Sequence, residues 1–191
     1  MSIAHRRLRA FTLIELLVVI TIIGILAGLA FPALNGAMNA AKKAEAATMV
    51  NQLRTGLTSY QTEYGTWPST SATPPITDTK VNADVLYTTL IAADDALALK
   101  NNPRKIVFIE FNAKSLRKAA GDKSPPPDPS EATLFVDPWN NQYQMVMDVD
   151  YDNKIDAGLP GDISINAATA IWSTGKDASS TKTADDVVSW K

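Results

Sequence analysis

The apolar residues divide the chain into an apolar N-terminal segment and a mixed remainder. Residues 16–41 contain no charged side chain, and the part up to Leu34 is apolar around every face of a helix. Such a helix reaches roughly 28 Å, close to the hydrocarbon thickness of a bilayer. Arg6, Arg7 and Arg9 precede it, and the positive-inside rule keeps that end in the cytoplasm. We therefore predict one membrane-crossing helix, with the later residues on the far side of the membrane.

Beyond Pro32 the pattern becomes that of an amphipathic helix. Six residues recur at helical spacing: Ala47, Val50, Leu53, Leu57, Tyr60 and Tyr64. This spacing predicts one buried stripe on a long helix over residues 11–64. Gly65 and Pro68 predict its C-cap and its end. Because Pro32 has no backbone donor, a kink or local melting is expected around residues 28–32.

The rest of the chain is predicted to combine short helices and strands. Helical spacing predicts a second helix over residues 82–99, with Asn82 as its N-cap. The strands are predicted at 106–111, 134–136, 142–150 and 168–173, with polar, proline-rich loops at 69–80 and 121–130. A long helix followed by strands predicts an α+β fold, with that helix lying across an antiparallel sheet.

Composition excludes several classes of function. Hydrophobic residues make up 46% of the chain and charged residues 20%, so a core can be buried. The chain has no cysteine, and His5 is its one histidine, which excludes disulfides, thiol nucleophiles and Ser-His-Asp sites. A net charge of −2 gives no footprint for nucleic acid. We therefore expect neither an enzyme nor a nucleic-acid-binding protein.

Glu15 lies one turn inside the apolar segment, where a carboxylate is costly in lipid and usually marks function. A secretory signal peptide cleaved near residues 28–30 is one interpretation of the segment, and a plain membrane anchor is another. Neither interpretation gives Glu15 a role.

Residues 9–20, Arg-Ala-Phe-Thr-Leu-Ile-Glu-Leu-Leu-Val-Val-Ile, resemble the type III signal of type IV pilins and type II secretion pseudopilins. In that family a membrane peptidase cuts before the Phe and N-methylates the new terminus. The resemblance implies cleavage between Ala10 and Phe11, with Ala10 in place of the usual Gly. It also makes Glu15 the fifth residue of the mature chain.

The resemblance gives Glu15 a role in filament assembly. Cleavage leaves a positively charged methylated amine on Phe11. A buried carboxylate is tolerated when it is paired with a cation, so Glu15 of one subunit paired with the Phe11 amine of its neighbour would set the stagger of parallel helices. Gly24 and Gly28 form a small-xxx-small pair that allows close helix approach. These four residues and Pro32 are the predicted assembly residues.

The same resemblance implies an organisation into three parts: a cleaved leader at 1–10, a transmembrane and assembly segment at 11–34, and a periplasmic α+β domain at 35–191. The N-terminus would be cytoplasmic and the protein would cross the bacterial inner membrane once. The implied partners are membrane lipid, other copies of the chain, minor pseudopilins, the prepilin peptidase and the inner-membrane secretion platform.

Two C-terminal motifs are also similar to pseudopilins. Asp137-Pro138-Trp139-Asn140-Asn141-Gln142-Tyr143 is similar to their Asp-Pro-Trp-Gly-Asn-x-Tyr turn, and Asn140 tolerates the left-handed conformation of the usual Gly. Residues 171–177 and 185–190 are similar to the calcium-bearing end of the major pseudopilin. This similarity implies four calcium ligands: Thr174, Asp177, Asp185 and Asp186.

A second place for calcium is predicted from spacing. Asp148, Asp150 and Asp152 lie at period two, and Asp156 completes the 1, 3, 5, 9 pattern of an EF-hand-like loop. Asn153 and Leu159 stand where such a loop has its Gly and closing Glu, and an exposed acidic turn explains the pattern equally well. At either place the calcium would be structural, with the C-terminal place favoured.

Two functions therefore remain open. The first is a structural subunit of a type II secretion or type IV pilus-like filament, and the lack of a C-terminal cysteine pair favours secretion. The second is a membrane-tethered periplasmic enzyme or binding domain that uses the signal for targeting alone.

Overall fold

The structure is a computed structural model of the chain. It describes residues 11–68, 81–82, 84–93, 96–119, 121–127, 132, 134–161, 163–179, 181 and 186–190. The predicted loop at 69–80 lies outside these residues. The chain separates into two compact units, Met1–Ala41 and Lys42–Lys191, and each is described by itself.

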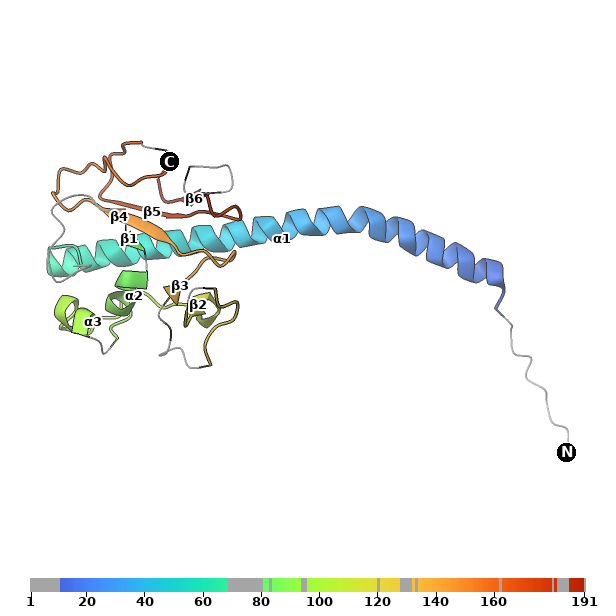
Figure 1. The fold of residues 1–191 in the computed structure, drawn as a ribbon, viewed down its shortest axis with the longest axis horizontal. Helices are drawn as coiled ribbons and strands as arrows, with labels where there is room; N and C mark the ends of the chain where they lie inside the picture. Colours follow the sequence, from blue (N-terminus) through green and yellow to red (C-terminus); the bar gives the residue numbers. More distant parts are fainter. Residues whose placement is uncertain are drawn as a thin grey trace, which may run out of the picture. The chain divides into compact units, whose positions relative to one another are not determined.

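One long helix, α1 (Leu13–Tyr64), contains most of the described part of the first unit and begins the second (Figure 1). The predicted long helix is thereby confirmed with its end at Tyr64, and it begins at Leu13 rather than at residue 11. The expected local melting around residues 28–32 is wrong, because helical backbone continues through Pro32. A proline removes one hydrogen bond of the helical ladder, and here the turns on either side remain helical.

In the second unit, α1 buries the predicted stripe. Val50, Leu53, Leu57 and Tyr60 are buried. The two ends of the stripe, Ala47 and Tyr64, are partly buried against the same core. Gly65 ends the helix as predicted, with φ of 72° and its N–H donating to the Gln61 carbonyl at 2.8 Å.

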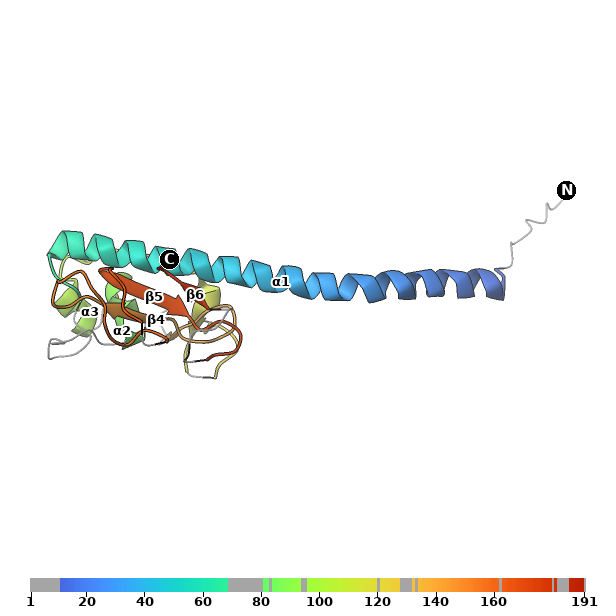
Figure 2. The same ribbon diagram turned by 90° about the horizontal axis from the view of Figure 1, so that it is seen from above.

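A four-stranded antiparallel sheet packs with this half of α1 (Figure 2). Its strands lie in the order β1 (Val81–Asn82), β4 (Gln144–Met147), β5 (Thr169–Ser173) and β6 (Val187–Val188). Met145 pairs with Ile171 and Trp172 pairs with Val188. A small second sheet joins β2 (Leu116–Arg117) to β3 (Leu134–Phe135). The fold is α+β, as predicted.

Both faces of the central strand β4 are covered. Met145 and Met147 belong to the core under α1, where Phe135 stacks on Tyr143 with ring centroids 5.1 Å apart. Val146 points into a second cluster with Ile155, Leu159, Ala170 and Trp172. Alternate residues of a strand face opposite sides of the sheet, which explains why β4 is apolar at successive positions.

The region after β1 differs from its prediction. Asn82 is not a helix cap, because it lies in β1 opposite Gln144. The predicted helix over residues 82–99 is two short ones, α2 (Asp84–Leu90) and α3 (Ala96–Asn101). Ala92 between them has φ of 58°, a left-handed conformation that ends a right-handed helix.

Residues 106–111 do not form the predicted strand. The N–H groups of Phe108 and Ile109 both donate to the carbonyl of Leu90, at 2.9 and 3.3 Å. The side chain of Ile109 packs against Gly56 of α1. The segment is thus an extended connection, and it leads to a short 3-10 helix, η1 (Ala113–Ser115). β6 was not predicted, because two valines are too short a run to stand out.

Candidate functional site

The expected processing point lies at the edge of the described residues. Ala10 and the basic leader are outside them. Phe11 is non-helical and 75% exposed, two residues before α1 begins. The expected cut before Phe11 therefore lies just ahead of the helix.

Thr12 and Glu15 together form the start of α1. The backbone N–H of Thr12 donates to Glu15 Oε2 at 2.8 Å, and the Thr12 hydroxyl donates to the same oxygen at 2.7 Å. The Glu15 N–H donates in return to Thr12 Oγ1 at 3.3 Å. This is a capping box, in which residues at Ncap and N3 satisfy each other's donors. This capping box was not predicted, although the sequence contains its Thr-x-x-Glu spacing.

The capping box directs the Glu15 carboxylate towards residue 12, beside the terminus that cleavage would create. It also places a negative charge in the first turn of a helix, where the helix dipole favours it. Glu15 is the one acidic residue between Phe11 and Ala41. The carboxylate is exposed, so it can accept a cation from outside the chain.

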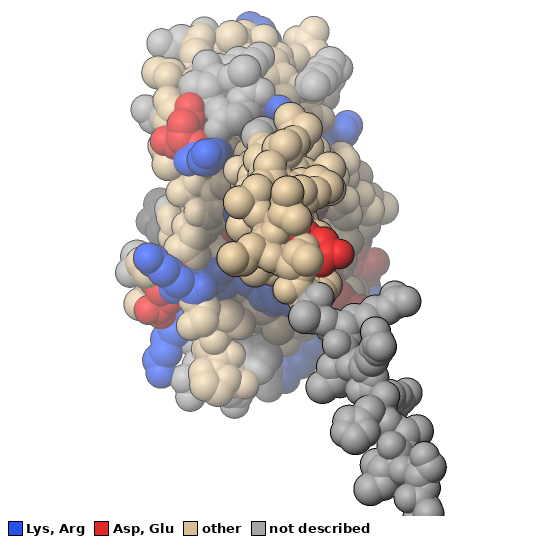
Figure 3. All heavy atoms as spheres, turned by 90° about the vertical axis from the view of Figure 1, so that its right-hand side faces the viewer, with Lys and Arg blue, Asp and Glu red and all other residues tan. Residues whose placement is uncertain are grey.

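The side chains that follow Glu15 form an exposed apolar surface. Leu16, Ile20 and Ile23 are more than half exposed, and Leu29 and Phe31 are 73% and 66% exposed. Figure 3 shows uncharged side chains covering this part of the helix. α1 is long and apolar enough to cross a membrane, by length and composition. Such a surface is unstable in water and needs lipid or partner helices.

Gly24 and Gly28 leave open space on this surface. Apart from the neighbouring residues and the backbone of its own helical turns, a Cβ atom at either position would meet no atom of the described residues within 4 Å. Neither glycine is therefore required by packing inside the chain. Their role in close approach to a neighbouring helix stays a prediction, as does that of Pro32.

The favoured calcium ligands near the C-terminus are only partly described. Asp185 lies outside the described residues. Asp177 is exposed, and its Oδ1 accepts a hydrogen bond from the Ser179 N–H at 2.9 Å. Thr174 and Asp186 are partly buried. This calcium site stays a prediction.

The acidic loop after β4 brings three of its four aspartates together. One carboxylate oxygen from each of Asp148, Asp150 and Asp152 lies within 4.8 Å of the other two. Asp156 is engaged elsewhere, because Lys154 Nζ lies 2.9 Å from its Oδ1 and the Ser164 hydroxyl donates to the same oxygen at 2.5 Å. The loop thus gathers a group of hard oxygen donors, the type that Ca²⁺ prefers.

The Asp-Pro-Trp turn is organised by Asp137, a role that sequence reasoning did not assign. Its buried Oδ1 accepts from the N–H groups of Trp139 and Asn141, at 2.9 and 2.8 Å. Its Oδ2 accepts from the Ser173 hydroxyl on β5 at 2.5 Å. Asn140 has φ of 75°, the left-handed conformation that was predicted. The motif therefore joins the turn to the sheet.

A cleft of about 710 Å³ beside this turn has a basic lining. Five of the residues that line it are Lys42, Lys114, Arg117, Lys123 and Lys176. Glu45 and Asp137 also line this cleft, and Figure 3 shows Lys and Arg side chains with Asp and Glu among them on the face turned to the viewer. The Arg117 guanidinium is used internally, since its Nε donates to Asn140 Oδ1 at 2.7 Å.

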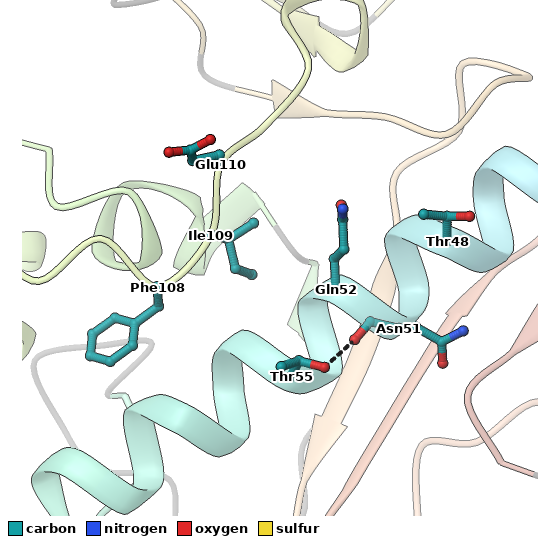
Figure 4. A pocket seen from close by; sticks show the side chains of 7 residues that line it. All are labelled: Thr48, Asn51, Gln52, Thr55, Phe108, Ile109 and Glu110. Atoms are coloured by element: carbon teal, nitrogen blue, oxygen red, sulfur yellow. Dashed lines mark hydrogen bonds between the residues drawn. The ribbon is translucent and has the colours of Figure 1, made fainter.

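A groove of about 510 Å³ between α1 and residues 108–110 offers no catalytic arrangement (Figure 4). Its helical wall consists of Thr48, Asn51, Gln52 and Thr55. The Thr55 hydroxyl donates to the Asn51 carbonyl at 2.9 Å. Among the residues lining the groove only Glu110 is charged, and a general acid–base pair needs a second titratable group.

The N-terminal part of the chain is similar to known proteins. Residues 5–31 match the family model described as the prokaryotic N-terminal methylation motif. Fimbrial protein EcpC of Eikenella corrodens is 34% identical over 85 residues, which are 44% of this chain and 55% of that protein. A fimbrial protein of Neisseria meningitidis is 41% identical over 61 residues, 32% of this chain and 36% of that protein.

Type IV major pilin protein PilE1 of Neisseria gonorrhoeae is 38% identical over 72 residues, which are 35% of this chain and 44% of that protein. The chain thus spans 55% or less of the length of these relatives, and no solved structure matches it. The relatives are named as fimbrial and pilin proteins rather than as enzymes, in agreement with the prediction that the chain is not an enzyme. The chain thus carries the prokaryotic N-terminal methylation motif, and part of it is similar to fimbrial proteins and type IV pilins.

Proposed function

We propose that the chain is a structural subunit of a type II secretion filament, assembled through its N-terminal helix to drive protein export. The observation that carries this proposal is the position of Glu15. Its carboxylate is held by Thr12 at the start of an exposed apolar helix. A charge in such a surface is costly unless a partner neutralises it.

The neutralising partner in this proposal is the methylated amine of Phe11 in the neighbouring subunit. The capping box already turns Glu15 Oε2 towards residue 12. The apolar side chains around it supply packing area but little information about register. Pairing of Glu15 with the amine would therefore set the stagger between parallel helices, and Gly24 and Gly28 would let those helices approach.

The secretion assignment rests on the C-terminal half. The Asp-Pro-Trp turn with Asp137 at its centre is similar to the corresponding turn of pseudopilins. The chain has no cysteine, whereas pilins usually close their C-terminal region with a cysteine pair. The curated relatives are named as pilins, and a pilus-like filament is therefore the nearest variant of the proposal.

The proposal also includes the steps by which the subunit is processed, anchored in the membrane and added to the filament. The prepilin peptidase removes residues 1–10 and methylates Phe11. Residues 11–34 then anchor the subunit in the inner membrane, with residues 35–191 in the periplasm, until the secretion platform adds it to the filament. Its filament partners are further copies of itself and minor pseudopilins.

Gene deletion and complementation test the proposal. A host strain that lacks the chain is complemented with wild type, Glu15→Ala or Glu110→Ala, and exported protein is measured in the medium and in the cells. We expect wild type and Glu110→Ala to restore export and Glu15→Ala to fail, although the Glu15→Ala chain still enters the membrane. Glu110 is a matched control because it is an exposed acid outside α1.

Two results would contradict the secretion assignment. Export that is normal in the deletion strain, together with loss of long surface filaments in electron micrographs, would identify a pilus subunit. Normal export and normal filaments would instead favour the membrane-tethered binding domain or enzyme.

A further inference from the structure

The acidic loop after β4 has an unusual backbone. Tyr151 and Asn153 have φ of 62° and 61°, left-handed values that non-glycine residues rarely adopt. The backbone here is therefore not that of an extended strand. On an extended strand, carboxylates at period two would be about 7 Å apart. In the loop, oxygens from Asp148, Asp150 and Asp152 come within 4.8 Å of one another.

Asp148 is the inner member of this group. Its side chain is 3% exposed, and its Oδ2 accepts a hydrogen bond from the Asn153 N–H at 2.7 Å. The other oxygen, Oδ1, is buried and has no hydrogen-bond partner among the described residues. A buried carboxylate oxygen without a donor is costly, and such atoms are rare in folded proteins unless something else satisfies them.

The basic side chain nearest in sequence does not supply that partner. Lys154 Nζ contacts both carboxylate oxygens of Asp156, at 2.9 and 3.0 Å. Asp150 and Asp152 add two further exposed carboxylates beside Asp148. The group therefore brings two exposed carboxylates close to a buried one that has an oxygen without a donor among the described residues, an arrangement that a hard cation can satisfy.

We propose that this loop binds a calcium ion, with Asp148 as the inner ligand and Asp150 and Asp152 as the outer ligands. Calcium suits the loop better than magnesium because it accepts irregular oxygen geometry and several carboxylates, whereas magnesium requires a near-ideal octahedron. The site is separate from the C-terminal residues Asp177 and Asp186. It does not depend on the type of filament that the chain forms.

The loop also contacts the end of α1. Trp67, just beyond the helix, donates from its indole Nε1 to the Asp148 carbonyl at 2.5 Å. The Trp67 N–H also donates to the Tyr151 hydroxyl at 3.3 Å. An ion in the loop would therefore hold β4 and the end of α1 together, and Trp67 would report its binding.

The test uses the full chain in detergent, freed of metal with a chelator. Binding of calcium chloride, with magnesium chloride as comparison, is measured by isothermal titration calorimetry, and the melting temperature is measured by circular dichroism. The variants are Asp150→Asn/Asp152→Asn, which changes exposed residues and should fold, and Asp148→Asn. Asp177→Asn is the matched control at the other predicted site.

We expect calcium to raise the melting temperature of wild type and Asp177→Asn by several degrees. In Asp150→Asn/Asp152→Asn and in Asp148→Asn, affinity should fall at least tenfold. Magnesium should bind at least tenfold more weakly than calcium to wild type. Unchanged calcium affinity in Asp150→Asn/Asp152→Asn would overturn the proposal. So would loss of binding in Asp177→Asn alone, or no binding to wild type at millimolar calcium.

Discussion

The hydroxyl and the backbone N–H of Thr12 both donate to one oxygen of Glu15, at 2.7 and 2.8 Å. Glu15 therefore has a role inside the chain, and we propose a second role for it in assembly. Within the chain it satisfies donors that a helix start leaves open. In the proposed filament it would present to the neighbouring subunit a carboxylate already oriented by Thr12, which would lower the entropy cost of pairing with an amine.

Replacing Thr12 tests this orientation without removing the charge. Thr12→Val keeps the backbone donor and the shape of the side chain but removes the hydroxyl. We expect several-fold faster hydrogen exchange of the amides in the first turn of α1 and shorter filaments in electron micrographs. Thr12→Ser, which keeps the hydroxyl, should behave as wild type. Equal filament lengths in Thr12→Val and wild type would show that the hydroxyl is irrelevant to assembly.

Gly56 is required by the contact between α1 and Ile109. A Cβ at this position would overlap Cγ1 and Cδ1 of Ile109. Alanine favours a helix by about 1 kcal/mol over glycine, but overpacking costs about 1–3 kcal/mol. We expect Gly56→Ala to lower the melting temperature of the chain in detergent.

Two further variants separate the clash from other effects of Gly56→Ala. Gly36→Ala, where a Cβ meets nothing within 4 Å, should leave the melting temperature unchanged or slightly higher. Adding Ile109→Ala to Gly56→Ala should cost less stability than the two single changes predict together. Strict additivity in this double-mutant cycle would argue against the contact.

Ser173 is predicted to stabilise the Asp-Pro-Trp turn. Its hydroxyl donates to buried Asp137 Oδ2 and accepts from the Gly175 N–H at 3.1 Å. Ser173→Ala removes both interactions and leaves a buried carboxylate oxygen without this donor, a loss of about 1–3 kcal/mol. Urea unfolding of wild type and variant measures it. A difference below about 0.5 kcal/mol, the usual scatter of neutral surface changes, would refute the prediction.

The same turn predicts a pH dependence. Burial raises the pKa of Asp137 above its usual 3.8, although hydrogen bonds from Ser173 and Asn141 act in the opposite direction. Because the pKa of Asp137 is higher in the folded than in the unfolded protein, protonated Asp137 favours folding. This contribution to the free energy of unfolding is complete below pH 3.8 and is lost as the pH rises through the pKa of the folded state. Asp137→Asn cannot titrate. Its destabilisation relative to wild type should therefore be larger near pH 4 than near pH 7, as measured by melting temperature.

A pH-independent difference between Asp137→Asn and wild type would show that Asp137 titrates normally. Other carboxylates contribute to the pH dependence of both proteins, so only the difference between them reports on Asp137.

The long helix and the α+β class could be predicted because their signals extend over many residues. The uncharged run to Ala41 and the stripe from Ala47 to Tyr64 each repeat the same pattern over several turns. The short elements could not be predicted in this way. Residues 106–111 alternate like a strand, but the N–H groups of Phe108 and Ile109 donate to the Leu90 carbonyl, a contact with a distant residue that a local pattern does not contain.

The candidate site residues also differ in how far the sequence could predict them. Phe11 and Glu15 could be identified because their motif is continuous in sequence. The spacing of Asp148, Asp150 and Asp152 predicted a shared calcium loop, but their close approach accompanies left-handed backbone at Tyr151 and Asn153, and nothing in the sequence indicates that conformation at Tyr151. Our prediction of a strand through residue 150 would have kept the three carboxylates apart; β4 instead ends at Met147.

The mature N-terminus tests the central claim most directly. The chain is expressed with a prepilin peptidase, purified from membranes, and its N-terminal peptide is analysed by mass spectrometry. A pilin-like subunit that assembles through Glu15 predicts a chain without residues 1–10 that begins with N-methyl-Phe11. A peptide that begins at Met1, or at Phe31 after signal-peptide cleavage, would contradict the account.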